Sequence, residues 1–255
     1  MMKKGIFVIT IVTSVALIIG GFYSYNSRIN NLSKTNKGKE VVKNSSEKNQ
    51  IDLTYKKYYK NLPKSVQNKI DDILSKNKEV TLTCVWQSDS VISEKFQQNL
   101  QTYYGNKFWN IKNITYNGET SEQLLTEKVQ NQVLATEPDV VLYEAPLFND
   151  NQNIEATVSL TSNEQLITNL ASTGAKVIVQ PSPPIYGGVV YPVQEEQFKQ
   201  SLSTKYPYID YWASYPEKNS DEMKRLFSDD GVYRTLNDSG NKIWLDYITE
   251  YFTAN

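Results

Sequence analysis

The stretch VTLTCVWQSDS, residues 80–90, joins a run of apolar and β-branched residues to a polar tripeptide. Residues 80–86 have the pattern of a buried strand, and a helix is expected over residues 93–104. Further strands are predicted at 110–116, 139–143 and 175–180, and further helices at 120–134, 161–171, 195–206 and 238–252. Strands separated by helices pair in parallel, so we expect a three-layer αβα domain, a parallel sheet flanked by helices. Ligands of such sheets bind at the carboxyl ends of the strands.

The N-terminal part differs in composition from this domain. Lys3 and Lys4 precede an uncharged apolar stretch over residues 5–23, which is long enough to cross a bilayer. No small-residue cleavage site follows, so we expect a single transmembrane signal anchor with residues 1–4 in the cytoplasm. Residues 24–50 are rich in Asn, Lys and Ser and predict a flexible linker. Residues 51–77 then form a helical lead-in, with a helix over 65–76, and residues 78–255 form the main domain.

Composition excludes several classes of function. Lys plus Arg total 27 and Asp plus Glu total 28, a net charge of −1 that offers no electrostatic basis for nucleic-acid binding. The chain has one cysteine, Cys84, and no histidine, so it has no intramolecular disulfide and no ordinary zinc, haem or copper site. We therefore expect neither a metal nor a cofactor. Cys84 stands in an apolar run and is expected to be a small buried residue.

Four short polar segments follow the predicted strands or precede the last helix. They are Ser88-Asp89-Ser90, Asn117-Gly118, Asn149-Asp150 and Asp230-Gly231-Val232-Tyr233. Singly, each has an ordinary structural interpretation as a helix cap, a turn or a loop. Because they follow strand ends of one parallel sheet, we expect them to lie together at its carboxyl edge.

In this order the segments resemble the SGNH (GDSL-type) hydrolase family, over roughly residues 78–255. The resemblance implies a flavodoxin-like sheet, a nucleophile at Ser90 and a covalent acyl intermediate. It also implies an oxyanion hole made by the N–H groups of Ser90 and Gly118 and by the side chain of Asn149, with Asp230 orienting the base. The implied reaction is ester hydrolysis or O-acyl transfer on cell-envelope carbohydrate. It would place the domain outside the cell, at a bacterial surface of the Gram-positive type.

The main departure from the family pattern is Tyr233, which stands where the family has its catalytic histidine. Because the chain contains no histidine, no other position can supply that base. A phenol with a pKa of about 10 is a poor proton acceptor at neutral pH. Ser88 and Leu147 also replace glycines of the family motifs, which alters loop backbones without removing a reacting group. Asp89, Glu144 and Asp150 are accessory candidates, and a buried Glu144 would be a suitable substitute base.

Three functions stay open on the sequence. The first is a membrane-anchored esterase or acyltransferase in which Asp230, a neighbouring carboxylate or the substrate activates Ser90. The second is a pseudoenzyme that binds a surface glycan, and the third is a scaffold of the envelope. The segment 181–188, rich in proline, is expected either to shape the pocket or to form a rigid surface loop.

Overall fold

The computed structural model describes residues 53–87, 90–229, 231 and 234–254. Its centre is a sheet of four parallel strands, in the order β2-β1-β3-β4. Their bounds are Val80–Gln87 (β1), Trp109–Tyr116 (β2), Val140–Ala145 (β3) and Lys176–Pro181 (β4). Beyond β4, Tyr208 forms a parallel bridge with Val179, so the chain continues the sheet for one residue on that side. All four strands were predicted, each to within two residues at its ends, and their parallel pairing is confirmed.

The first face of the sheet is covered by α2 (Lys64–Ser75), α3 (Ser90–Tyr104) and α10 (Asp238–Thr253), and its core is largely aromatic. Even-numbered side chains of β1, such as Leu82 and Cys84, point to this side because successive residues of a strand face opposite ways. Phe96 of α3 packs edge-to-face on Phe252 of α10, with ring centroids 5.4 Å apart. Cys84 is buried as expected, and burial raises the pKa of its thiol.

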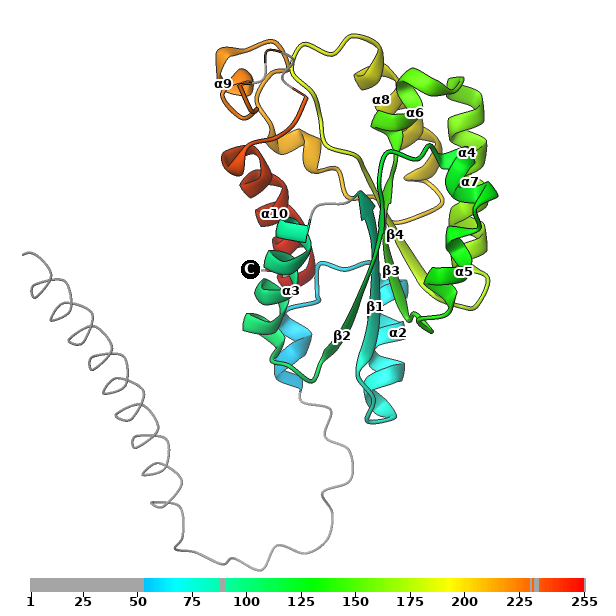
Figure 1. Ribbon diagram of the computed structural model, residues 1–255. Coiled ribbons are helices and arrows are strands. Elements are labelled where there is room, and N and C mark those ends of the chain that lie inside the picture. The colour runs from blue at the N-terminus through cyan, green and yellow to red at the C-terminus, as the bar shows by residue number, and fades with distance from the viewer. Residues whose placement is uncertain (1–52, 88–89, 230, 232–233, 255) are drawn as a thin grey trace, which may run out of the picture. The chain divides into compact units, whose positions relative to one another are not determined.

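The second face is covered by α4 (Ser121–Thr126), α5 (Val129–Leu134), α7 (Ala156–Ala171) and α8 (Val190–Leu202). A short helix, α6 (Leu147–Asn153), follows β3 and packs against α7 and α8. The two helical layers lie on either side of the sheet (Figure 1), which confirms the αβα class. Smaller elements complete the described chain: η1 (Leu53–Lys57), η2 (Tyr211–Ser214) and α9 (Asp221–Lys224).

Four predictions about helices need correction. The helix expected over 120–134 is two helices, because Lys128 adopts a left-handed φ of 58° and turns the chain between them. Helix α6 was expected to be a loop, since its Asn and Asp residues favour turns, but Leu147 is fully buried and anchors it. Helices α7 and α8 each begin five residues before the predicted start. Polar residues on the buried side of α7, Ser159 among them, concealed the helical pattern.

The lead-in joins the same core as the strands: Val66 and Ile70 of α2 are fully buried with the first-face residues of β1. No helix among the described residues is long and apolar enough to span a bilayer. The predicted anchor at 5–23 and the predicted linker at 24–50 lie outside the described residues.

Candidate functional site

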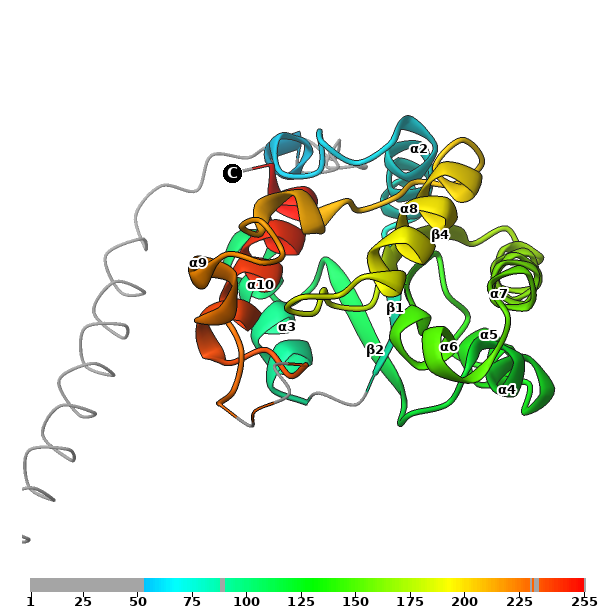
Figure 2. The same cartoon turned by 90° about the horizontal axis from the view of Figure 1, so that it is seen from above.

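The carboxyl ends of the strands carry the predicted site. Figure 2 looks onto this edge, with α3 and α10 on one side and α4, α6 and α7 on the other. Ser90 is the first residue of α3, so its backbone lies at the N-terminus of a 15-residue helix directly after β1. Such an end carries a partial positive charge that stabilises an anion. Ser88, Asp89, Asp230 and Tyr233, which were predicted to belong to the site, lie outside the described residues.

On the α4 side, the structure brings together the two segments predicted to hold oxyanion donors. Gly118 has a φ of +90°, which a residue with a side chain rarely adopts, so glycine is required by the backbone here. The side-chain amide of Asn149 donates to the carbonyl of the next residue, Glu119, at 3.0 Å. A primary amide has two hydrogens, and the second has no acceptor among the described residues.

Asp150 is fully buried and holds three helices together. Its carboxylate accepts from the backbone N–H of Ser121 at 2.7 Å, from the hydroxyl of Ser159 at 2.6 Å and from the amide of Asn163 at 3.2 Å. Tyr143 donates to the same Asn163 at 2.7 Å. Burial raises the pKa of Asp150, while the donated hydrogen bonds oppose that rise. Asp150 was predicted as an accessory site residue, but these contacts give it a structural role.

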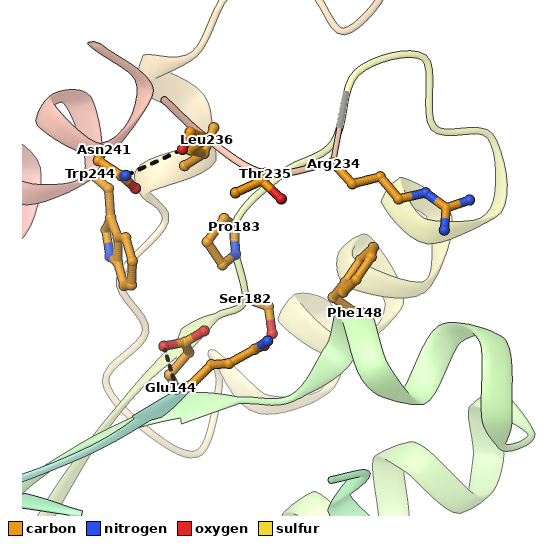
Figure 3. A pocket seen from close by; sticks show the side chains of 10 residues that line it. Glu144, Phe148, Ser182, Pro183, Arg234, Thr235, Leu236, Asn241 and Trp244 are labelled. Carbon is orange, nitrogen blue, oxygen red and sulfur yellow. Dashed lines mark hydrogen bonds between the residues drawn. The ribbon is translucent and has the colours of Figure 1, made fainter. Parts of the chain in front are cut away.

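A pocket opens on the α10 side of the same edge (Figure 3), and we call it the edge pocket. It has a volume of about 230 Å³. Its described lining residues are Gln87, Glu144, Phe148, Ser182, Pro183, Arg234, Thr235, Leu236, Asn241 and Trp244. Pockets that enclose drug-sized ligands measure about 300–1,000 Å³. The edge pocket is therefore smaller than such pockets.

Glu144 is the carboxylate of the edge pocket. It lies in β3, has no exposed surface, and its Oε2 accepts from the backbone N–H of Gln87 at 3.3 Å. Gln87 ends β1, three residues before Ser90. Beside Glu144 in the sheet, Gln180 is also fully buried and accepts from the indole N–H of Trp244 at 3.2 Å. The sequence named Glu144 as a candidate base, and the structure places it in the pocket.

The chain after β4 forms a fixed wall of the edge pocket. The hydroxyl of Ser182 donates to the carbonyl of Ala145 at 2.7 Å, and the Ser182 carbonyl accepts from Trp212 at 3.0 Å and from Tyr191 at 3.1 Å. Ser182 and Pro183 both line the edge pocket, so the beginning of the segment 181–188 shapes this pocket.

The sequence did not identify Arg234, Trp244 or Phe148 as pocket residues. Arg234 and Thr235 directly follow the Asp-x-x-Tyr segment, so a fuller use of that motif would have drawn attention to them. Trp244 and Phe148 enter through the packing of α10 and α6 at the sheet edge, which no local sequence signal reports. No group of three His, Cys, Asp or Glu side chains in the described part of the chain is arranged to hold a metal ion.

Solved structures share this fold. A lipase/acylhydrolase from Enterococcus faecalis matches with a TM-score of 0.54 at 17% identity, covering 67% of this chain and 94% of its own. An acetylxylan esterase from Geobacillus stearothermophilus, as a catalytic mutant, matches with a TM-score of 0.57 at 13% identity, covering 68% and 94%. A GDSL-like lipase from Bacteroides thetaiotaomicron matches with a TM-score of 0.52 at 12% identity, covering 73% and 96%.

No family model and no curated protein matches the sequence. At identities this low the structural likeness bears on the fold alone. The chain has the fold of the SGNH (GDSL-type) hydrolases, as its four polar segments predicted.

Proposed function

We propose that this protein is a serine esterase or O-acyltransferase that acts on a short acyl ester of a carbohydrate. The observation that carries the proposal is the edge pocket, which combines a buried carboxylate, Glu144, with a size suited to a small acyl group. Two further features support it: Ser90 begins α3 after the end of β1, and Asn149 of α6 donates to the carbonyl of Glu119, next to Gly118. The fold is shared with acetylxylan esterases, which act on esters of a carbohydrate.

In the proposed reaction, the Oγ of Ser90 attacks the carbonyl carbon of the ester, and its proton passes to a base. The ester C–O bond then breaks, the proton goes to the leaving sugar oxygen, and an acyl-serine remains. Water attacks the acyl-serine, gives its proton to the same base and releases the carboxylic acid, which restores Ser90. A sugar hydroxyl in place of water gives acyl transfer. The N–H groups of Ser90 and Gly118 and the second amide hydrogen of Asn149 stabilise the oxyanion of each step.

In this proposal Glu144 takes the part of the missing histidine. Glu144 has no exposed surface and lies in the wall of the pocket. The backbone N–H of Gln87 fixes one oxygen of Glu144 and leaves the carboxylate in the wall of the pocket. An acetylxylan esterase of this fold has been studied as catalytic mutants that replace a serine and an aspartate.

The test is hydrolysis of 4-nitrophenyl acetate by the full-length protein in detergent, together with labelling by a serine-reactive fluorophosphonate. We expect turnover and labelling by the wild type, and loss of both on Ser90→Ala by at least about 10³-fold, because removing a nucleophile eliminates the covalent route. Ser172→Ala, at an exposed serine of the α7 C-cap, is the matched control and should behave as wild type. Equal activity of Ser90→Ala and wild type would refute the proposal.

One observation favours a second function, binding of a surface glycan without cleavage: the chain has no histidine at all. The variant Tyr233→His separates the two functions. A large gain of esterase activity from an inactive wild type, with glycan binding unchanged by Ser90→Ala, would favour the binding protein. We also propose that residues 5–23 anchor the protein in the membrane with the domain outside the cell. Protease accessibility of the domain in intact cells tests that orientation.

A further inference from the structure

We propose that Arg234 makes the edge pocket selective for an anionic saccharide, one that carries a carboxylate or a phosphate beside the acylated sugar. The inference rests on the proposed function to the extent that the edge pocket is the substrate site. It adds the charge of the substrate, which neither the fold nor the catalytic residues specify.

The first argument is the charge balance of the pocket. Among its described lining residues only Glu144 and Arg234 are ionisable. Glu144 is fully buried, whereas Arg234 is exposed. The cation that an approaching ligand meets at the rim is therefore Arg234.

The second argument is that no ion pair or hydrogen bond occupies the guanidinium of Arg234 within the described chain. Arg225, the other arginine of the described chain, is paired with Glu222 at 3.3 Å. Lysine supplies nearly all the basic residues of this sequence, with arginine only at positions 28, 225 and 234. Arginine differs from lysine because its planar fork binds a carboxylate or phosphate through two parallel hydrogen bonds.

The third argument is position. Arg234 lies on the Phe148 side of the pocket, away from the carboxylate of Glu144 (Figure 3). With the ester at Glu144, the small volume forces the rest of a saccharide out over the rim. Phe148, Pro183 and Leu236 offer that part of the ligand apolar surface, and Arg234 offers it charge. An anionic group on the acylated sugar or its neighbour would meet the guanidinium there.

Binding measured by calorimetry tests the inference without requiring turnover. The full-length protein in detergent is titrated with trigalacturonate, glucose 1-phosphate and neutral xylotriose. We expect at least one anionic probe to bind about 10-fold more tightly than xylotriose, and this preference to weaken as NaCl rises. Which anionic probe binds distinguishes a carboxylate-bearing from a phosphate-bearing ligand.

Variants then assign the effect. Arg234→Gln should remove the anionic preference, and Arg234→Lys should restore part of it, since a lysine keeps the charge without the fork. Arg225→Gln, which removes an exposed and already paired guanidinium, should change nothing. Equal affinity for charged and neutral probes, no binding of either anionic probe, or an equal loss in the Arg225 variant would overturn the inference. Failure of the esterase proposal would appear separately, as hydrolysis that is indifferent to Ser90→Ala.

Discussion

Asp150 and Glu144 are two carboxylates with no exposed surface, on opposite sides of one sheet. Asp150 lies on the side of α4 and α7, where Ser121, Ser159 and Asn163 all donate to it. Glu144 points to the side of α3 and α10, accepts from the Gln87 backbone and lines the edge pocket. The two residues are six positions apart in the sequence and have different tasks.

The difference teaches that burial alone does not identify a reactive carboxylate. An acid surrounded by donors has its charge stabilised by fixed partners and holds the structure together. Glu144 lines the pocket, and in the proposed function its carboxylate serves as the base. The polar segment Asn149-Asp150 contains Asp150, but the carboxylate that lines the pocket, Glu144, comes from the preceding strand, β3.

Glu144→Gln tests the proposed role of Glu144 most directly, because it keeps the shape of the side chain and removes the base. We expect the kcat for 4-nitrophenyl acetate to fall by about 10²–10⁴-fold, the range typical of general acid–base catalysis. The matched control is Glu195→Gln, a change at a carboxylate that is also buried but does not line the edge pocket. Activity of Glu144→Gln within twofold of wild type, with the fold intact by circular dichroism, would remove Glu144 from the mechanism.

Asp150→Ala tests the other side of the comparison. The change leaves three buried donors without their acceptor, and each unsatisfied donor costs about 1–3 kcal/mol, so we expect the free energy of unfolding to fall by about 3 kcal/mol. Urea denaturation measures it. Asp246→Ala is the control, because Asp246 is an exposed acid paired with Lys242 on α10, where a surface pair contributes about 0–1 kcal/mol. A loss no larger than that of the control would contradict the structural role of Asp150.

The sequence predicted the fold well because the strands are distinctive. β3 is buried at every position and β1 at nearly every one, which produces the continuous apolar runs of a parallel sheet. It did not predict α6, since Asn149 and Asp150 favour turns in isolation and are helical here through tertiary contacts.

The candidate site was partly predictable for the same physical reason. Residues at strand ends, such as Glu144 and Gly118, follow from the parallel topology, because every strand brings its carboxyl end to one edge. Phe148 and Trp244 reach the pocket through the packing of helices far apart in the chain. Arg234 was missed because a lone basic residue in a loop has no periodic signature.

A third buried carboxylate, Glu195, should have the smallest of these effects, on the pH dependence of stability. It is 3% exposed on α8, on the same side as Asp150, and its carboxylate accepts from the hydroxyl of Tyr208 at 2.7 Å. Burial raises the pKa of Glu195 above its ordinary 4.5 despite that hydrogen bond. The stability that it contributes is therefore complete below pH 4.5 and is lost as the pH rises through the folded-state pKa. Relative to wild type, Glu195→Gln should gain stability as the pH rises above 4.5 toward the raised folded-state pKa.

Its neighbour Glu196 should give the opposite sign and so serves as the matched control. Hydrogen bonds from Gln200 and Lys199 lower the pKa of Glu196, so its contribution is present above the unfolded-state pKa and is lost as the pH falls. Relative to wild type, Glu196→Gln should lose stability as the pH rises toward 4.5, because Glu196 of the folded wild type ionises below that value. Urea denaturation of the three proteins at several pH values measures both slopes. Slopes of the same sign would mean that burial does not raise the pKa of Glu195. In that case the hydrogen bond from Tyr208 would stabilise the ionised carboxylate enough to outweigh burial.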